Sequence, residues 1–177
     1  MEIIGKIASA IASDSIDVVD RGSGNNIMID FMVNGKKIGY MECLITTVNH
    51  LDEIFSESIV SDEDEFIDDD ETEEFDNEYS HDLMDLFEYS DKVCELGMFE
   101  MLPKWRHKHL AKPCFLKGLD WIKKNKGGFK AFVGRALSQD MEKGLEQSNL
   151  IGFYESVGFD VIADYGDFNG SIIIMEI

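Results

Sequence analysis

The chain has 177 residues, the length of one domain, and 44% hydrophobic and 11% aromatic residues, which is enough for one sizeable core. No run approaches the roughly 20 apolar residues of a membrane span. The first residues lack the basic region of a secretory signal, so we expect neither feature. The three cysteines, Cys43, Cys94 and Cys114, have no paired spacing. They favour reduced thiols in the cytoplasm and argue against a Cys/His zinc site.

The formal charge of −20 is concentrated in one segment. Residues 52–91 contain nineteen Asp and Glu and no Lys or Arg, and the other 17 acidic residues nearly balance the 16 basic ones. Such dense like charge opposes packing. We therefore expect one domain over 1–177 with an acidic insertion at 52–91, whose centre, 56–78, is a mobile loop. Residues 104–143 have the opposite bias, with eleven Lys and Arg against three acids, which favours binding of phosphates or acidic partners.

Apolar spacing predicts the secondary structure. Ile3, Ile7 and Ile11 recur at helical spacing, which predicts a helix over 2–12. Two alternating segments, 26–33 and 37–47, flank an Asn-Gly turn and predict a β-hairpin. The remaining expected elements are a short helix over 79–90, a strand over 93–102, a helix over 106–124 that Pro113 kinks or delays, a strand over 129–133, a helix over 142–157 that ends at Gly158, and strands over 159–163 and 171–177. This order predicts an α/β fold with a sheet of mixed direction.

Two patterns in the second half of the chain resemble a known family. The first is Met101-Leu-Pro-Lys-Trp-Arg-His-Lys-His-Leu-Ala111, and the second is Gln147-Ser-Asn-Leu-Ile-Gly-Phe-Tyr-Glu-Ser-Val-Gly-Phe159. They resemble the R-x-x-G-x-G/A loop and the N-x-x-A-x-x-L-Y-E-x-x-G-F segment of the GNAT superfamily of acetyl-CoA-dependent N-acetyltransferases. The resemblance covers most of 26–177. It implies a GNAT-like mixed central β-sheet flanked by helices, with the acidic insertion between the hairpin and the cofactor strand.

The resemblance implies acetyl-CoA as the cofactor. A loop that enters a helix presents unpaired N–H groups, and the helix dipole favours an anion there. The pyrophosphate would lie on these amides, with Arg106, Lys108 and Lys112 adding positive charge. His109 stands where the family usually has Gly, and its side chain either obstructs the phosphates or, if protonated, contacts them. The implied cofactor-binding residues are Met101, Arg106, His107, Lys108, His109, Leu110, Ala111 and Gln147, the last in place of the family's Asn.

The resemblance also implies two catalytic residues. Tyr154 would be the general acid that protonates the departing thiolate, a role typically worth roughly 10²–10⁴-fold. Glu95 stands where a histone-acetylating branch of the family has its general base. On a regularly alternating strand it would share a face with Gly97, Phe99 and Met101. From the residues alone, Tyr154 is equally explained as a packed aromatic and Glu95 as an edge-strand carboxylate.

Two functional hypotheses follow. The first is a GNAT-like N-acyltransferase that moves an acetyl group from acetyl-CoA to an amine of a small molecule or protein. The alternative is a non-catalytic GNAT-fold binding protein, such as an inhibitor, nucleic-acid-mimicking decoy or assembly factor, that acts through its acidic segment. That segment, 52–91, either binds a cationic small molecule or basic protein surface or is a solvated loop. At −20 we expect no direct nucleic-acid binding. A phage origin would suit the alternative, and the cytoplasm would then be that of a bacterial host.

Overall fold

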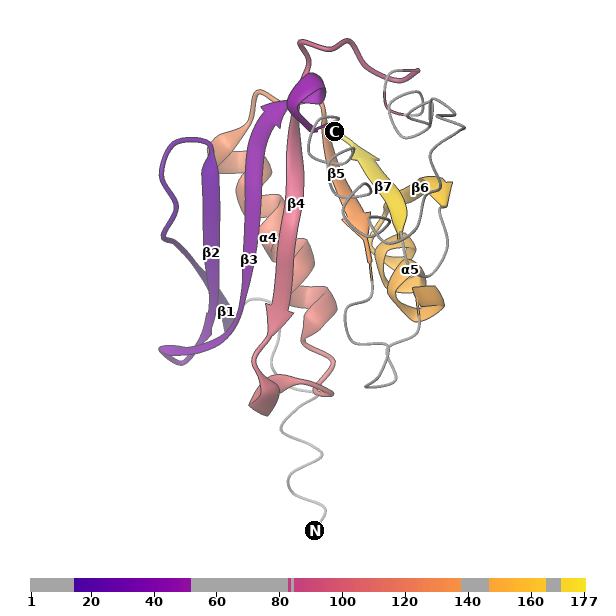
Figure 1. The fold of residues 1–177 in the computed structure, drawn as a ribbon. Helices are drawn as coiled ribbons and strands as arrows, with labels where there is room; N and C mark the ends of the chain where they lie inside the picture. Colours follow the sequence, from indigo (N-terminus) through magenta and orange to yellow (C-terminus); the bar gives the residue numbers. More distant parts are fainter. Residues whose placement is uncertain (1–14, 52–82, 84, 138–146, 165–169) are drawn as a thin grey trace, which may run out of the picture.

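The computed structural model describes residues 15–51, 83, 85–137, 147–164 and 170–177 (Figure 1). These residues form one seven-stranded sheet, one 3₁₀ turn, a short helical segment at 48–51 and two longer helices. The strands are β1 (Ile16–Asp20), β2 (Asn26–Val33), β3 (Lys36–Thr47), β4 (Lys92–Met101), β5 (Ala131–Ala136), β6 (Asp160–Asp164) and β7 (Ser171–Glu176). The 3₁₀ turn is η2 (Pro103–Trp105), and the helices are α4 (Ala111–Lys126) and α5 (Gln147–Ser156).

The strand order is β1-β2-β3-β4-β5-β7-β6. Neighbours are antiparallel except β4 and β5, which are parallel because α4 connects them as a crossover. The predicted α/β sheet of mixed direction is confirmed. Helices α4 and α5 lie on one face of the sheet, as Figure 1 shows. The main core packs between that face and the helices around Phe31, Phe115 and Phe132, which are all fully buried.

The hairpin and the central strand were predicted to within one residue. The Asn34-Gly35 turn between β2 and β3 has positive φ at both residues, as a tight hairpin turn requires. Strand β1 was not predicted, and β5 begins two residues later than expected. The expected helix over 2–12 and the loop centre 56–78 lie outside the described residues, as do 142–146. The described part of the helix expected over 79–90 is mainly turns and bends from residue 85 onward.

The helix expected over 106–124 begins only at Ala111, so this prediction was wrong at its start. Pro113 is the third helical residue. In the first turn an N–H has no intrahelical acceptor, so proline costs little there. Pro113 therefore delays the helix rather than kinking it, and the basic residues before Ala111 form a loop. At the other predicted helix end, Gly158 has φ of 100°, which confirms the terminating glycine after α5.

An irregularity in β4 overturns the predicted face of Glu95. The register shifts so that Leu96 pairs with Cys43 and Met98 with Glu42, which leaves Gly97 as an inserted residue. An extra residue reverses the alternation beyond it. Glu95 consequently shares the outer face with Met98 and Glu100, whereas Phe99 and Met101 point into the core beneath the helices.

Within the described part of the chain, no helix is both long enough and apolar enough to cross a membrane.

Candidate functional site

Strands β4 and β5 separate along their length. They pair only over Cys94–Leu96 and Phe132–Gly134, although β4 continues to Met101 and β5 to Ala136. Figure 1 shows the two strands diverging towards the end of the sheet where α4 begins. A small cavity of about 30 Å³ lies at this opening, and its lining includes Gly97, Phe99 and Tyr154. Past Leu96, the backbone of β4 has no strand partner on its β5 side among the described residues.

Tyr154 reaches this opening from α5. Its ring packs edge-on against Phe115, Phe153 and Phe159, with ring centroids 5.5–5.8 Å apart. Its hydroxyl has no hydrogen-bond partner among the described residues. Burial, helped by the nearby Cys43, raises the pKa of Tyr154 to about 12. The hydroxyl therefore keeps its proton throughout the neutral range. Tyr154 is thus both a packed aromatic residue and a potential proton donor.

The loop from Arg106 to Leu110 has an unusual backbone. His107 has φ of 58° and His109 has φ of 57°, both in the left-handed region that side chains disfavour. Among the described residues, the amides from His107 to Lys112 donate to no acceptor, and α4 has no side-chain cap. Unpartnered amides in such a turn, followed by a helix N-terminus, form a site suited to anions. His109 thus holds the backbone conformation that glycine adopts easily.

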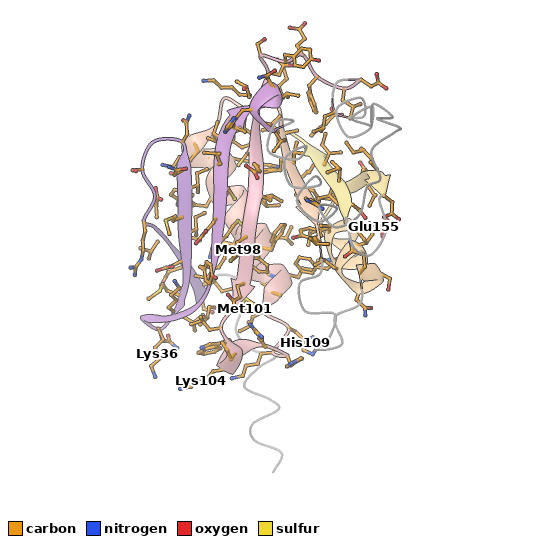
Figure 2. The ribbon with its side chains drawn as sticks, in the orientation of Figure 1. Lys36, Met98, Met101, Lys104, His109 and Glu155 are labelled. Carbon is orange, nitrogen blue, oxygen red and sulfur yellow. The ribbon has the colours of Figure 1, made fainter. Side chains whose placement is uncertain are left out.

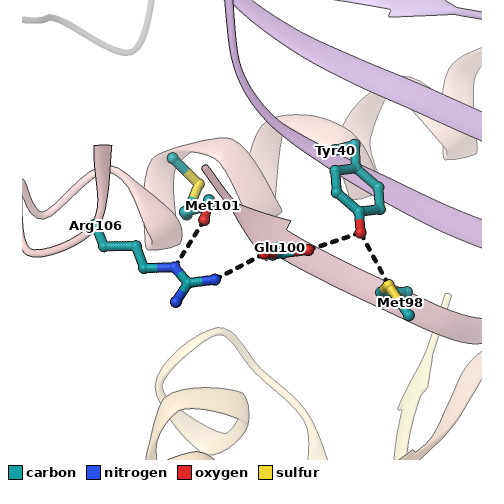
Figure 3. Close-up of polar contacts among 5 residues, drawn as sticks. All are labelled: Tyr40, Met98, Glu100, Met101 and Arg106. Atoms are coloured by element: carbon teal, nitrogen blue, oxygen red, sulfur yellow. Dashed lines mark hydrogen bonds and ion pairs between the residues drawn. The ribbon is translucent and has the colours of Figure 1, made fainter. Parts of the chain in front are cut away.

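Arg106 is held by the sheet rather than pointing freely into solvent (Figure 3). Its Nε donates to the carbonyl oxygen of Met101 at 3.0 Å, and its Nη2 donates to Glu100 Oε1 at 2.7 Å. The Tyr40 hydroxyl donates to the other Glu100 oxygen at 2.7 Å and lies 3.1 Å from the sulfur of Met98. This hydrogen bond to Glu100 raises the pKa of Tyr40. Together these contacts tie the start of the loop to β3 and β4.

Beside the loop lies a groove of about 880 Å³ between α4 and α5. Its lining is basic at His109, Lys112 and Lys117 and otherwise largely apolar, with Ala111, Pro113, Leu116 and Phe153. His109, labelled in Figure 2, lies at the loop end of the molecule near Lys104. Lys112 also donates to the carbonyl oxygen of Ser156 at 2.7 Å and so joins the two helices.

Besides Arg106, four of the residues predicted to bind cofactor have structural contacts of their own. Lys108 stacks over the Trp105 ring, with its Nζ 4.6 Å from the centroid. Met101 and Leu110 are buried in the core. Gln147 is buried too, and its Nε2 donates to the Ala136 carbonyl oxygen at 2.5 Å, which fastens the start of α5 to the end of β5.

Glu95 lies on the opposite face of the sheet, in a second cleft of about 390 Å³ that Glu42 and Gly97 also line. Burial raises the pKa of the Glu95 carboxyl, and the nearby His50 partly offsets this. A half-buried carboxylate with a raised pKa is a stronger base than a fully solvated one. Sequence reasoning missed Tyr40, Glu42 and Glu100. The polar residues at alternate positions of the hairpin were the available signal, since they mark one face of the strand.

No protein-family model matches the sequence, and no curated protein matches it either. Solved structures with a similar fold include three N-acetyltransferases. PaiA N-acetyltransferase from Thermoplasma acidophilum, in complex with coenzyme A, has a TM-score of 0.46 and 15% identity over 86% of this chain. Arabidopsis thaliana NAA60, in complex with acetyl-CoA, has a TM-score of 0.49 and 11% identity over 88% of this chain and 78% of its own. The ribosomal-protein-S18-alanine N-acetyltransferase from Escherichia coli has a TM-score of 0.46 and 12% identity, covering 100% of this chain and 90% of its own.

The chain spans less than two thirds of the length of PaiA, namely 62%. All three sequences are at most 15% identical to this one.

Proposed function

We propose that this protein is a GNAT-like N-acyltransferase that transfers an acetyl group from acetyl-CoA to an amine. One observation carries the proposal: Tyr154 lines the opening between β4 and β5, and the loop that follows β4 has amides without acceptors among the described residues. An anion site and a protonated hydroxyl at one end of a divided sheet suit a substrate with phosphates at one end and a reactive thioester at the other.

The residues present fit the cofactor. The amides from His107 to Lys112 have no acceptor among the described residues and can donate to phosphate oxygens. Lys112 and Lys117 place positive charge along the adjoining groove. His109 holds a left-handed conformation that glycine, the family's usual residue at this position, adopts easily. When bound, acetyl-CoA supplies the acetyl thioester. Within the part of the chain that the structure describes, the β4 backbone beyond Leu96 lacks a strand partner towards β5, so it can pair with amide groups of the cofactor.

Two side chains are suited to proton transfer, Tyr154 as the donor and Glu95 as the acceptor. Tyr154 holds its proton at Oη, because burial keeps its pKa at about 12, and it can donate to a thiolate in the opening. Glu95 faces the other side of β4, where it can accept the proton of an ammonium. Phe115 and Phe159 pack against Tyr154 and give the donor side apolar walls. Donor and acceptor of protons thus lie on opposite faces of the same strand.

The test is a calorimetric titration of the full chain with acetyl-CoA at low and moderate salt, followed by turnover assays on simple amines. We expect micromolar binding that weakens with salt. Tyr154→Phe should lower turnover about 100-fold or more with nearly unchanged cofactor affinity. Tyr89→Phe is the matched control, because Tyr89 is 56% exposed and lies outside the opening. No binding at millimolar acetyl-CoA would refute the proposal, and a thermally destabilised Tyr154→Phe that loses binding and turnover together would mark Tyr154 as a packing residue.

A further inference from the structure

The second cleft lies on the sheet face that α4 and α5 leave uncovered. Its floor is the backbone of β2, β3 and β4, and the turn between β1 and β2 around Gly22 forms one wall. The carboxylates of Glu42 and Glu95 line it together with the aliphatic side chains of Met28 and Leu44. The cleft therefore combines negative charge with an apolar wall.

The turn that forms the wall is fixed to the sheet. The Arg21 amide donates to the Met28 carbonyl oxygen at 2.7 Å, and the Ile45 amide donates to the Asn25 carbonyl oxygen at 2.9 Å. A Cβ on Gly22 would lie 2.2 Å from the backbone oxygen of Asn26, so only glycine fits there. Backbone contacts of this kind preform the cleft before any ligand binds.

Few cations compensate the two carboxylates: the nearby His50 acts on Glu95, and Arg21 also lines the cleft. Neither Glu42 nor Glu95 makes a hydrogen bond or ion pair with any described residue. Leu44 pairs with Glu95, and Glu42 lies two residues before Leu44 on the same strand face. The two carboxylates are thus diagonal neighbours, at the roughly 7–8 Å Cα separation that is typical of such positions. Arg21 already pairs with Asp30. A cation that entered the cleft would meet both carboxylates.

The cleft and the opening beside Tyr154 share one residue. Gly97 lines both cavities, and it is the inserted residue of β4. Because Gly97 has no side chain, only backbone separates the two cavities at that position. A nucleophile held by the carboxylates would lie next to the opening where the thioester is expected.

We propose that this cleft binds the acceptor as a primary ammonium on an unbranched aliphatic chain, with Glu42 as the residue that selects for positive charge. The proposal rests on the proposed function, since it names the acceptor of that transfer. The ammonium lies between Glu42 and Glu95, and the aliphatic chain runs along Met28 and Leu44. A free linear diamine and a lysine side chain share this chemistry.

The test titrates two probes, 1,4-diaminobutane and Nα-acetyl-lysine methylamide, into the full chain without cofactor, with binding followed by NMR. We expect at least one probe to bind and Glu42→Gln to weaken it about tenfold, as the loss of one charge-assisted contact predicts. Glu155→Gln is the matched control, because Glu155 is exposed on α5 and lines none of these cavities. The uncharged 1,4-butanediol should not bind. Melting temperatures verify that each variant is folded.

Binding of the diamine alone identifies a free amine as the acceptor, and binding of the lysine probe alone identifies a protein side chain. The proposal is overturned if neither probe binds, if butanediol binds as tightly as the diamine, or if Glu42→Gln binds like the wild type. An acetyl-CoA titration on the same samples separates the two proposals. Acetyl-CoA binding without probe binding refutes only the proposal that this cleft binds the acceptor. Glu42-dependent probe binding without acetyl-CoA binding refutes the transferase proposal, and with it the acceptor role, and leaves the cleft as an ammonium-binding site.

Discussion

We predict that Arg106 supports cofactor binding by holding the loop in shape rather than by touching phosphate. Its guanidinium makes two bonds to the end of β4, one to the Met101 carbonyl and one to Glu100. The loop that follows contains two left-handed histidines, each of which costs about 1–2 kcal/mol relative to ordinary backbone. Contacts that fix the start of the loop therefore oppose its relaxation into another conformation.

The magnitude follows from the two bonds. The side chains of Arg106 and Glu100 are 38% and 37% exposed, so their ion pair is screened and worth about 0.2–1 kcal/mol. The bond to the Met101 carbonyl adds about 0.5–1.5 kcal/mol. Removing Arg106 therefore costs about 1–2 kcal/mol of loop stability. If only the formed loop binds, Arg106→Ala weakens acetyl-CoA binding by up to about 5- to 30-fold.

Two further variants test whether Arg106 acts as a clamp, which holds the loop in shape, or as a direct phosphate ligand. Arg106→Lys keeps the charge but cannot reproduce the two directed bonds, so a clamp loses nearly as much as in Arg106→Ala. Glu100→Gln removes a nearby negative charge. It weakens binding if Arg106 is a clamp and strengthens binding if the guanidinium contacts phosphate. Calorimetry on the three variants is the assay. Wild-type affinity in Arg106→Lys together with tighter binding in Glu100→Gln would refute the clamp.

Three other predictions concern stability, the loop and the acidic segment. Burial raises the pKa of Glu95 above its ordinary 4.5, so its contribution to stability is present below pH 4.5 and is lost as the pH rises through the raised pKa. Glu95→Gln should therefore raise the melting temperature at pH 7.5 but not at pH 4, and an equal change at both would contradict this. The free energy of unfolding of His109→Gly should be about 0.5–1 kcal/mol higher than that of His109→Ala, because only glycine relieves the left-handed strain. His109→Gly should also preserve or strengthen acetyl-CoA binding. Equal stabilities of the two variants would contradict the strain. Deletion of 56–78 should leave a folded domain that no longer captures a cationic partner in a pull-down at low salt, and identical partners with and without the segment would remove the binding-protein alternative.

The sequence predicted the elements whose signals are local. The Asn34-Gly35 turn set the hairpin register, because both residues tolerate the positive φ that a tight turn needs. Gly158 marked the end of α5 for a similar reason. The sequence did not predict strand β1, because the strand is short and only Ile16 among its residues is fully buried. It therefore shows little alternation of apolar and polar residues. Its place at the sheet edge is decided by pairing with β2, which is not a local property.

The candidate site likewise has some features that the sequence predicted and others that depend on the tertiary structure. The order of residues around Arg106 and Tyr154 carried the family resemblance, and the structure places both residues near the end of the sheet where β4 and β5 separate. The sequence could not show that Gly97 is an inserted residue, because a β-bulge depends on the partner strand, and this one extra residue moves Glu95 to the face opposite Phe99. Nor could it show that Arg106 is bonded to Glu100, since that contact depends on how the chain turns after β4. Local conformational preferences can be predicted from the sequence, whereas contacts between side chains of different strands form only when the sheet assembles.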